Sequence, residues 1–133
     1  PTIEPYKTEW KVFDSKSSVA GTIDMVYKKP NGELFIFDWK RTTKLVNDIG
    51  TIIKSDFEYG YDELENLSNN SYNKYCLQQN LYKYILEDNY GEKVSSMNIL
   101  VLHPRYHTYF HLQVPNLIKE TEFLIRKARE KSI

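Results

Sequence analysis

Five segments of this chain are short runs of alternating or continuous apolar residues, and two longer segments place apolar residues at helical spacing. Alternation indicates a β-strand, because successive side chains of a strand point to opposite faces. Spacings of three and four indicate one face of an α-helix. The predicted strands are 8–13, 19–27, 34–40, 97–102 and 108–114, and the predicted helices are 74–88 and 116–131.

This order of elements predicts one α/β domain over residues 1–133. Strand 34–40 is apolar on both of its faces, which is typical of a central strand that is covered on both sides. Residues 41–73 show no clear period and contain two glycines and the acidic cluster Asp62–Glu65. We expect a long, partly helical insertion there.

The composition is that of a globular chain, with 27% charged and 41% hydrophobic residues. The net charge of zero argues against a basic surface over the whole molecule, although basic residues exceed acidic ones after residue 73. That excess fits either a phosphate backbone or a solvated helix face. Apolar runs are too short for a membrane span, no signal peptide is recognisable, and Cys76 stands alone, so we expect an intracellular protein without a membrane partner.

Two carboxylates are predicted to meet across a hairpin. Pro30-Asn31-Gly32 is a strong turn signal between strands 19–27 and 34–40. A hairpin that is symmetric about Asn31 places Asp24 directly opposite Asp38. Directly paired residues have Cβ atoms about 4.5–5.5 Å apart. Two carboxylates at that distance repel each other unless a proton or a divalent cation lies between them.

Lys40 shares a strand face with Asp38, whereas Trp39 points to the other face. Carboxylate oxygens suit Mg²⁺ or Mn²⁺, ions that bind phosphate oxygens and keep several waters. A lysine beside such a site can orient or deprotonate a water and stabilise charge that develops on phosphorus. The alternative is a solvated salt bridge at the end of a strand.

The predicted helix 74–88 carries a second set of polar residues. Gln78 and Tyr82 are four residues apart, so they lie on one helix face, beside an apolar stripe of Leu77, Leu81 and Ile85. Both would then sit at the edge of the core, close to the sheet. The alternative is that they belong to the exposed side of an amphipathic helix.

Together these motifs resemble the PD-(D/E)XK nucleases of the RecB-like branch. The matching strings are Gly21-Thr22-Ile23-Asp24, Asp38-Trp39-Lys40 and Gln78-X-X-X-Tyr82. Asp38-Trp39-Lys40 followed by Arg41-Thr42-Thr43 is most similar to the mitochondrial genome maintenance exonuclease. The resemblance implies a restriction-endonuclease-like core, in which helices flank a central mixed β-sheet.

The resemblance also implies roles for individual residues. Asp24, Asp38 and Lys40 would be the catalytic set, and Asp24, Asp38 and the backbone carbonyl of Trp39 would hold Mg²⁺ or Mn²⁺. Glu9, Gln78 and Tyr82 would support the site. Arg41, Thr42 and Thr43 would contact the phosphate backbone of the substrate.

The activity implied is metal-dependent hydrolysis of DNA, exonucleolytic on single strands or ends, with DNA favoured over RNA as the partner. Relatives place a helix before the first strand, so we expect this chain to be part of a larger protein, with a helicase or polymerase domain as a possible companion. The alternatives are a non-catalytic nucleic-acid-binding or scaffolding domain of the same fold, and an RNA endonuclease.

Three histidines, one cysteine and a group of tyrosines give weaker signals for chemistry. His103, His107 and His111 have a spacing that would suggest zinc on a helix, but their neighbours indicate strand and turn. Cys76 has no histidine near it in the sequence and is predicted to be a buried helix residue. The tyrosines at 59, 61, 72 and 75 could stack on unpaired bases or pack the insertion onto the core.

Overall fold

The fold is an α/β arrangement of a five-stranded mixed sheet and two helices, seen in a computed structural model that describes residues 3–53 and 71–131. The strands lie in the order β1-β2-β3-β4-β5. The chain runs β1 (Glu4–Phe13), β2 (Ala20–Lys28), β3 (Leu34–Arg41), α1 (Ser71–Asn89), β4 (Val94–Leu102), β5 (Phe110–Gln113) and α2 (Ile118–Lys131). The predicted order of elements is therefore confirmed.

The structure describes only the two ends of the expected partly helical insertion, residues 41–53 and 71–73. Residues 42–53 contain no helix and only an isolated bridge between Val46 and Ile52, whereas α1 already begins at Ser71. Leu45 and Val46 are nevertheless fully buried, and the Tyr106 hydroxyl donates a hydrogen bond to the Val46 carbonyl at 2.7 Å. This segment is thus anchored to the loop after β4. The acidic cluster Asp62–Glu65 lies outside the described residues.

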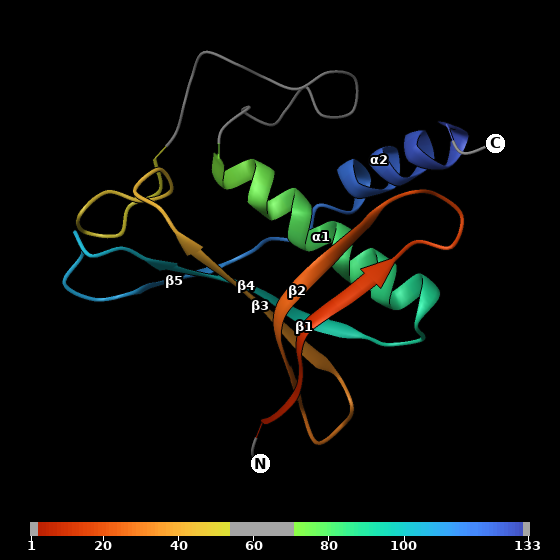
Figure 1. Cartoon of the computed structure of the whole chain (residues 1–133), viewed down its shortest axis with the longest axis horizontal. Helices are drawn as coiled ribbons and strands as arrows, with labels where there is room; N and C mark the ends of the chain where they lie inside the picture. The colour runs from red at the N-terminus through yellow and green to blue at the C-terminus, as the bar shows by residue number, and fades with distance from the viewer. Residues whose placement is uncertain (1–2, 54–70, 132–133) are drawn as a thin grey trace.

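β3 is the centre of the sheet. It pairs antiparallel with β2 and parallel with β4, and β1 and β5 extend the sheet by antiparallel pairing on either side. Parallel neighbours need a crossover connection, and the segment that contains α1 provides it between β3 and β4. The crossover carries α1 onto one face of the sheet, with β1 and β2 passing in front of it (Figure 1).

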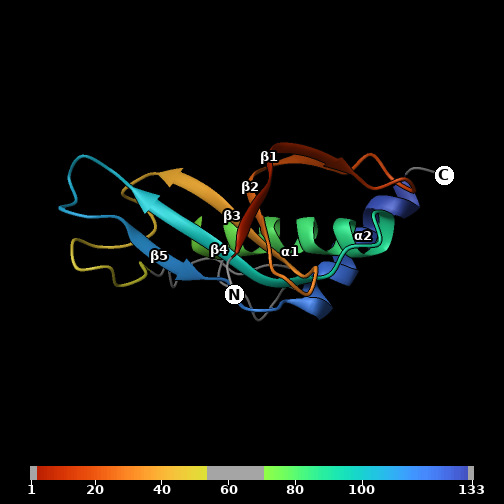
Figure 2. The same ribbon diagram turned by 90° about the horizontal axis from the view of Figure 1, so that it is seen from below.

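Helix α1 lies between the sheet and α2 (Figures 1 and 2). This position explains why its core face differs from the predicted stripe. Leu77 and Leu81 are only half-buried, whereas Gln79 and Asn80 are buried. A helix that is covered on two sides buries more than one stripe, so polar residues enter the interior. Cys76 is buried in α1, as predicted.

Asn80 shows how such a buried amide is accommodated. Its Nδ2 donates to the carbonyls of Cys76 and Pro115, at 2.8 and 3.0 Å, and its Oδ1 accepts from the Leu117 backbone N–H at 2.8 Å. A buried polar group has to be hydrogen-bonded to avoid a desolvation penalty. Asn80 therefore fixes the approach of the chain to α2 against the middle of α1.

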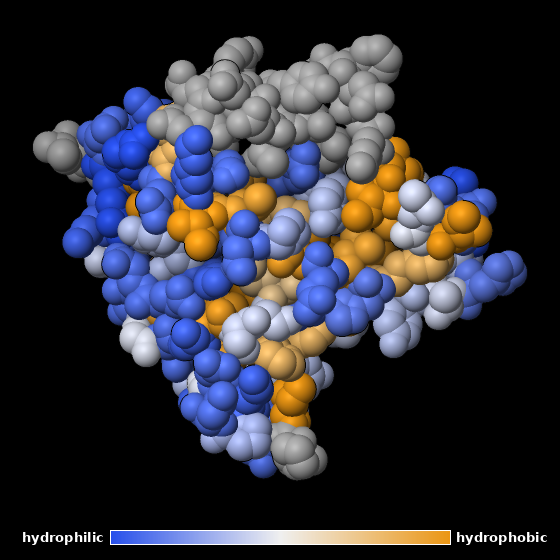
Figure 3. Space-filling model, turned by 180° about the vertical axis from the view of Figure 1, so that it is seen from behind, coloured by the Kyte–Doolittle hydropathy of each residue, from blue (hydrophilic) through white to orange (hydrophobic). Residues whose placement is uncertain are grey.

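The second face of β3 is not covered by the described residues, contrary to the prediction. Phe35, Phe37 and Trp39 line a shallow cavity of about 300 Å³ together with Tyr27 and Leu100, and Trp39 remains 47% exposed. The apolar pattern correctly identified a central strand. It did not show which face the helices cover, and they lie on the face of β3 that carries Ile36. Apolar side chains also reach the surface between polar ones on the face seen from behind (Figure 3).

A buried ion pair joins the β1–β2 turn to helix α2. Asp14, in the turn after β1, is only 1% exposed and receives Arg129 of α2 through Nε at 3.0 Å and Nη2 at 2.8 Å. Ser17 and Asn89 donate two further hydrogen bonds to it. These donors, above all Arg129, hold the pKa of Asp14 well below its usual range. One carboxylate thus joins the β1–β2 turn and the ends of both helices.

Replacing Arg129 by methionine would leave this buried carboxylate without its cation. We expect Arg129→Met to lower the free energy of unfolding by about 3 kcal/mol, measured by urea denaturation at neutral pH. Lys119→Met, which removes an exposed cation from the same helix, should have little effect. Equal losses in the two variants would show that the ion pair does not contribute to stability.

Candidate functional site

The hairpin between β2 and β3 has the predicted register. Met25 pairs with Phe37 and Val26 with Ile36, so the same register continued by one residue places Asp24 opposite Asp38. The turn closes through the Gly32 N–H, which donates to the Lys29 carbonyl at 2.9 Å, and Gly32 has a φ of 88° that favours glycine. Local turn chemistry thus sets the distance between the two carboxylates.

Asp24 is anchored by the backbone of the opposite strand. Its Oδ2 accepts a hydrogen bond from the Trp39 N–H at 2.9 Å. The N–H and C=O of one strand residue point to the same side, so the Trp39 carbonyl also faces β2. The Trp39 ring itself lies on the opposite face of the sheet. The two acids and one backbone carbonyl therefore converge at the end of β3.

Asp38 is a buried carboxylate with few donors. It is 5% exposed, and its Oδ2 lies 2.8 Å from the Lys40 Nζ yet makes no hydrogen bond of good geometry. The pKa of Asp38 is raised to about 6, mainly by burial and also by the neighbouring Asp24 carboxylate, while Lys40 opposes the shift. A buried carboxylate oxygen with few donors, beside a second carboxylate, is the kind of hard oxygen ligand that Mg²⁺ or Mn²⁺ binds.

Lys40 is held on two further sides by α1. Its Nζ donates to the Gln78 Oε1 at 3.2 Å and lies 4.3 Å from the centre of the Tyr75 ring. The sequence predicted base stacking or packing of the insertion for Tyr75, and no contact with Lys40. The signal was present, because Tyr75, Gln78 and Tyr82 follow one another at spacings of three and four, which is one helix face.

Tyr82 packs beneath the site against β2. It is buried, and its pKa is raised by burial and by the charge of Asp38, while a hydrogen bond from the Thr22 backbone opposes the shift. A Cβ built on Gly21 would lie 2.5 Å from Tyr82 Cε1 and 2.9 Å from its hydroxyl oxygen. Gly21 therefore allows α1 to approach β2 closely enough for Gln78 to reach Lys40.

The remaining predicted residues lie around this group without joining it. Glu9 is exposed and has a φ of 46°. It lies opposite Asp24 in the β1–β2 register, between the pairs Thr8–Met25 and Trp10–Ile23. Arg41 ends β3 on its exposed side. Thr42 caps the following turn, accepting from the Lys44 N–H at 3.0 Å, and Thr43 follows it half-buried. Within the described residues, none of these four side chains makes a hydrogen bond or ion pair with Asp24 or Asp38.

Within the described residues, no hydrogen bond or ion pair joins the histidines to one another or to Asp24 and Asp38. His103 Nδ1 accepts from the Arg105 N–H at 3.1 Å, and His111 Nε2 lies 2.7 Å from Asn98 Oδ1. Within residues 3–53 and 71–131, no group of three or more histidine, cysteine or acidic residues could hold a metal ion. A metal at the end of β3 would therefore depend on two carboxylates, a carbonyl and water.

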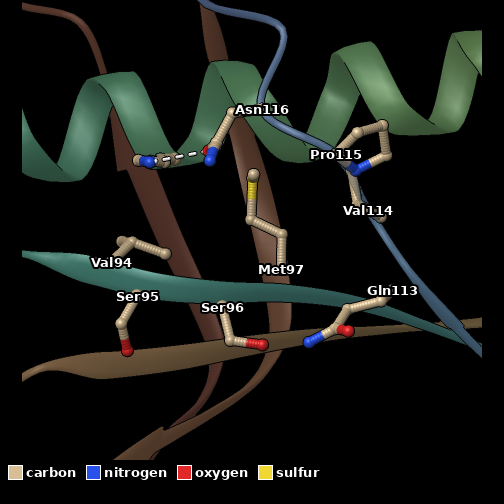
Figure 4. A pocket seen from close by; sticks show the side chains of 9 residues that line it. Val94, Ser95, Ser96, Met97, Gln113, Val114, Pro115 and Asn116 are labelled. Carbon is tan, nitrogen blue, oxygen red and sulfur yellow. Dashed lines mark hydrogen bonds between the residues drawn. The ribbon is translucent and has the colours of Figure 1, made fainter.

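A hollow elsewhere on the molecule contains none of the predicted site residues. It has a volume of about 310 Å³ and is lined by residues 94–97 of β4, residues 113–116 and Lys83 of α1 (Figure 4). The lysine that lines this hollow already has a partner, since Lys83 Nζ donates a hydrogen bond to Asn116 Oδ1 at 2.8 Å.

In the part of the chain that the structure describes, neither helix is long and apolar enough to cross a bilayer.

No protein-family model matches this sequence, and no curated protein matches it. Among solved structures, the chain is similar to one described as "Crystal structure of SSO0001", with a TM-score of 0.48 and 11% identity over 94% of this chain and 50% of that one. The chain thus spans about half the length of that protein. A likeness at this level carries no conclusion about function.

The contact between Gly21 and Tyr82 can be tested by a double-mutant cycle. Gly21→Ala should lower the free energy of unfolding by roughly 1–3 kcal/mol, because the new methyl group overlaps the tyrosine ring. In a Tyr82→Ala background the same substitution should cost little. Urea denaturation of the four proteins measures both values, and an unchanged cost in the Tyr82→Ala background would contradict this packing.

The raised pKa of Asp38 gives a pH dependence with a definite sign. The folded protein holds the Asp38 proton more tightly than the unfolded chain, so this contribution to stability is present at low pH and is lost as the pH rises through about 6. Relative to Asp38→Asn, the wild type should lose on the order of 1 kcal/mol between about pH 4 and pH 7.

Urea denaturation with EDTA at several pH values measures this difference. The slope with pH is the readout, because a constant offset from the altered Lys40 contact does not change it. A parallel pair of curves would mean that Asp38 titrates normally.

Proposed function

We propose that this chain is a metal-dependent nuclease with a restriction-endonuclease-like core. One observation carries the proposal: the β2–β3 register, continued by one residue, sets Asp24 beside Asp38, and the Lys40 Nζ lies 2.8 Å from Asp38. Two acids and a lysine at the end of a central strand form the constellation that the PD-(D/E)XK resemblance implies. Their proximity supports it, since Asp24 and Asp38 are brought together only through folding.

The donor set fits Mg²⁺ or Mn²⁺. Asp24, Asp38 and the Trp39 carbonyl supply hard oxygen ligands, and Asp38 keeps a buried oxygen without a hydrogen bond. When bound, the ion would polarise a phosphate and lower the pKa of a water molecule. The repulsion that now raises the pKa of Asp38 would be relieved by a cation between the two acids.

The chain's own residues would arrange the substrate around this centre. Lys40 would stabilise negative charge that develops on the scissile phosphate, and Gln78 would hold its ammonium in place. Tyr82 supports the floor of the site. Arg41, Thr42 and Thr43, at and after the end of β3, would contact the phosphate backbone on either side.

Hydrolysis would leave a 5′-phosphate and a 3′-hydroxyl. By resemblance, the substrate is DNA, attacked on single strands or at ends. The mixed charge of the chain fits a site that contacts a short stretch of backbone instead of a long basic groove.

Cleavage of end-labelled single- and double-stranded DNA and of RNA tests the proposal. With Mn²⁺ or Mg²⁺ the wild type should cut, and with EDTA it should not. Lys40→Ala, Asp24→Asn and Asp38→Asn should each reduce the rate by about 100-fold or more, because each removes charge stabilisation or a ligand. Lys16→Ala, which removes an exposed lysine from the β1–β2 turn, is the control and should cut normally.

The outcomes separate the rival functions. No cleavage of any substrate with Mn²⁺, combined with tight DNA binding, would favour a non-catalytic binding domain. Cleavage of RNA in preference to DNA would favour the RNA endonuclease. Cleavage that survives Lys40→Ala would point to a contaminating nuclease and would remove the support for this site.

A further inference from the structure

The ammonium group of Lys40 is enclosed by three groups that attract positive charge. Asp38 Oδ2 lies at 2.8 Å, Gln78 Oε1 at 3.2 Å and the centre of the Tyr75 ring at 4.3 Å. The side chain is 20% exposed, so one side remains open to an incoming ligand. Asp38 and Gln78 are among the residues that carry the PD-(D/E)XK resemblance, whereas Tyr75 is not.

Tyr75 reaches Lys40 because of where it sits on α1. It lies three residues before Gln78 and seven before Tyr82, so the three side chains follow one another along a single helix face. The face of its ring lies against the ammonium, which is the geometry of a cation–π contact. Within the described residues its hydroxyl makes no hydrogen bond, so the ring itself is the contact.

The Tyr75 ring restricts the conformational freedom of the Lys40 side chain. Four rotatable bonds separate the ammonium from the backbone, and an ion pair with Asp38 fixes a distance but leaves the direction free. The Gln78 oxygen restrains a second direction, and the aromatic face closes the third.

We propose that Tyr75 is a positioning residue for Lys40: its aromatic face holds the ammonium beside Asp38 in the orientation that the reaction uses. The inference rests on the proposed nuclease function for its catalytic consequence. The contact itself does not depend on that function, and it can be tested separately.

The first test reads the contact without any activity. Protons on Lys40 Cε next to the Tyr75 ring should show an upfield ring-current shift by NMR, assigned by the loss of the signal in Lys40→Arg. The shift should persist in Tyr75→Phe and disappear in Tyr75→Leu. Tyr72→Leu is the matched control, since Tyr72 lies on the same helix but contacts Cys76. An unchanged Lys40 signal in Tyr75→Leu overturns the proposal.

The second test reads the consequence. Tyr75→Leu should lower kcat about tenfold with little change in KM, whereas Tyr75→Phe should stay within about twofold of the wild type. In a Lys40→Ala background, Tyr75→Leu should cause no further loss, because a residue that acts through Lys40 has nothing left to position. An equal loss in both backgrounds would mean that the ring acts elsewhere, for example on the substrate, and would overturn the proposal.

The two tests separate this inference from the proposed function. A wild type that cuts no substrate contradicts the nuclease proposal, while the NMR shift still decides whether Tyr75 positions Lys40. A wild type that cuts, together with a Tyr75→Leu variant of full activity, contradicts the inference and leaves the nuclease proposal standing.

Discussion

The close packing of α1 against β2 at Gly21 is the constraint on which the candidate site depends. The Tyr82 ring occupies the space that a Cβ at position 21 would need. This approach brings Gln78 and Tyr75 within reach of Lys40 on the neighbouring strand. A helix displaced by the width of one methyl group would lose these contacts, because hydrogen bonds weaken steeply beyond their normal length. Gly21 is therefore needed for close packing against Tyr82, and not for a turn or a left-handed backbone conformation.

Two buried aspartates in this fold illustrate how surroundings separate a structural acid from a candidate functional one. Asp14 is enclosed by donors, with a bidentate Arg129 and hydrogen bonds from Ser17 and Asn89, and its pKa is lowered. Asp38 faces a second carboxylate and one lysine, and its pKa is raised. A satisfied carboxylate contributes to stability, whereas an unsatisfied one stores electrostatic energy that a cation or a proton can release. Asp14 and Asp38 thus differ in how readily each carboxylate could bind a cation or a proton.

The sequence predicted the order of the elements and the register of the β2–β3 hairpin, because both depend on short-range patterns. Alternation marked the strands, and Pro30-Asn31-Gly32 fixed the pairing. It did not predict the buried face of α1, where Gln79 and Asn80 replace Leu77 and Leu81 in the interior. It also did not predict the open face of β3. Both errors have one cause: a periodic pattern shows which residues can be buried, while the neighbouring elements decide which of them are.

The sequence by itself determined the residue types at the site and the local spacing that places Asp24 opposite Asp38 and Gln78 on the same helix face as Tyr82. Only the tertiary structure decided that these two pairs meet, that Asp38 is buried and short of donors, and that the Tyr75 ring completes the surroundings of Lys40. The physical reason is sequence separation. Spacing along a strand or a helix fixes geometry over a few residues, whereas the contact between Lys40 and Gln78 joins positions 38 residues apart, and the packing of the whole crossover sets it.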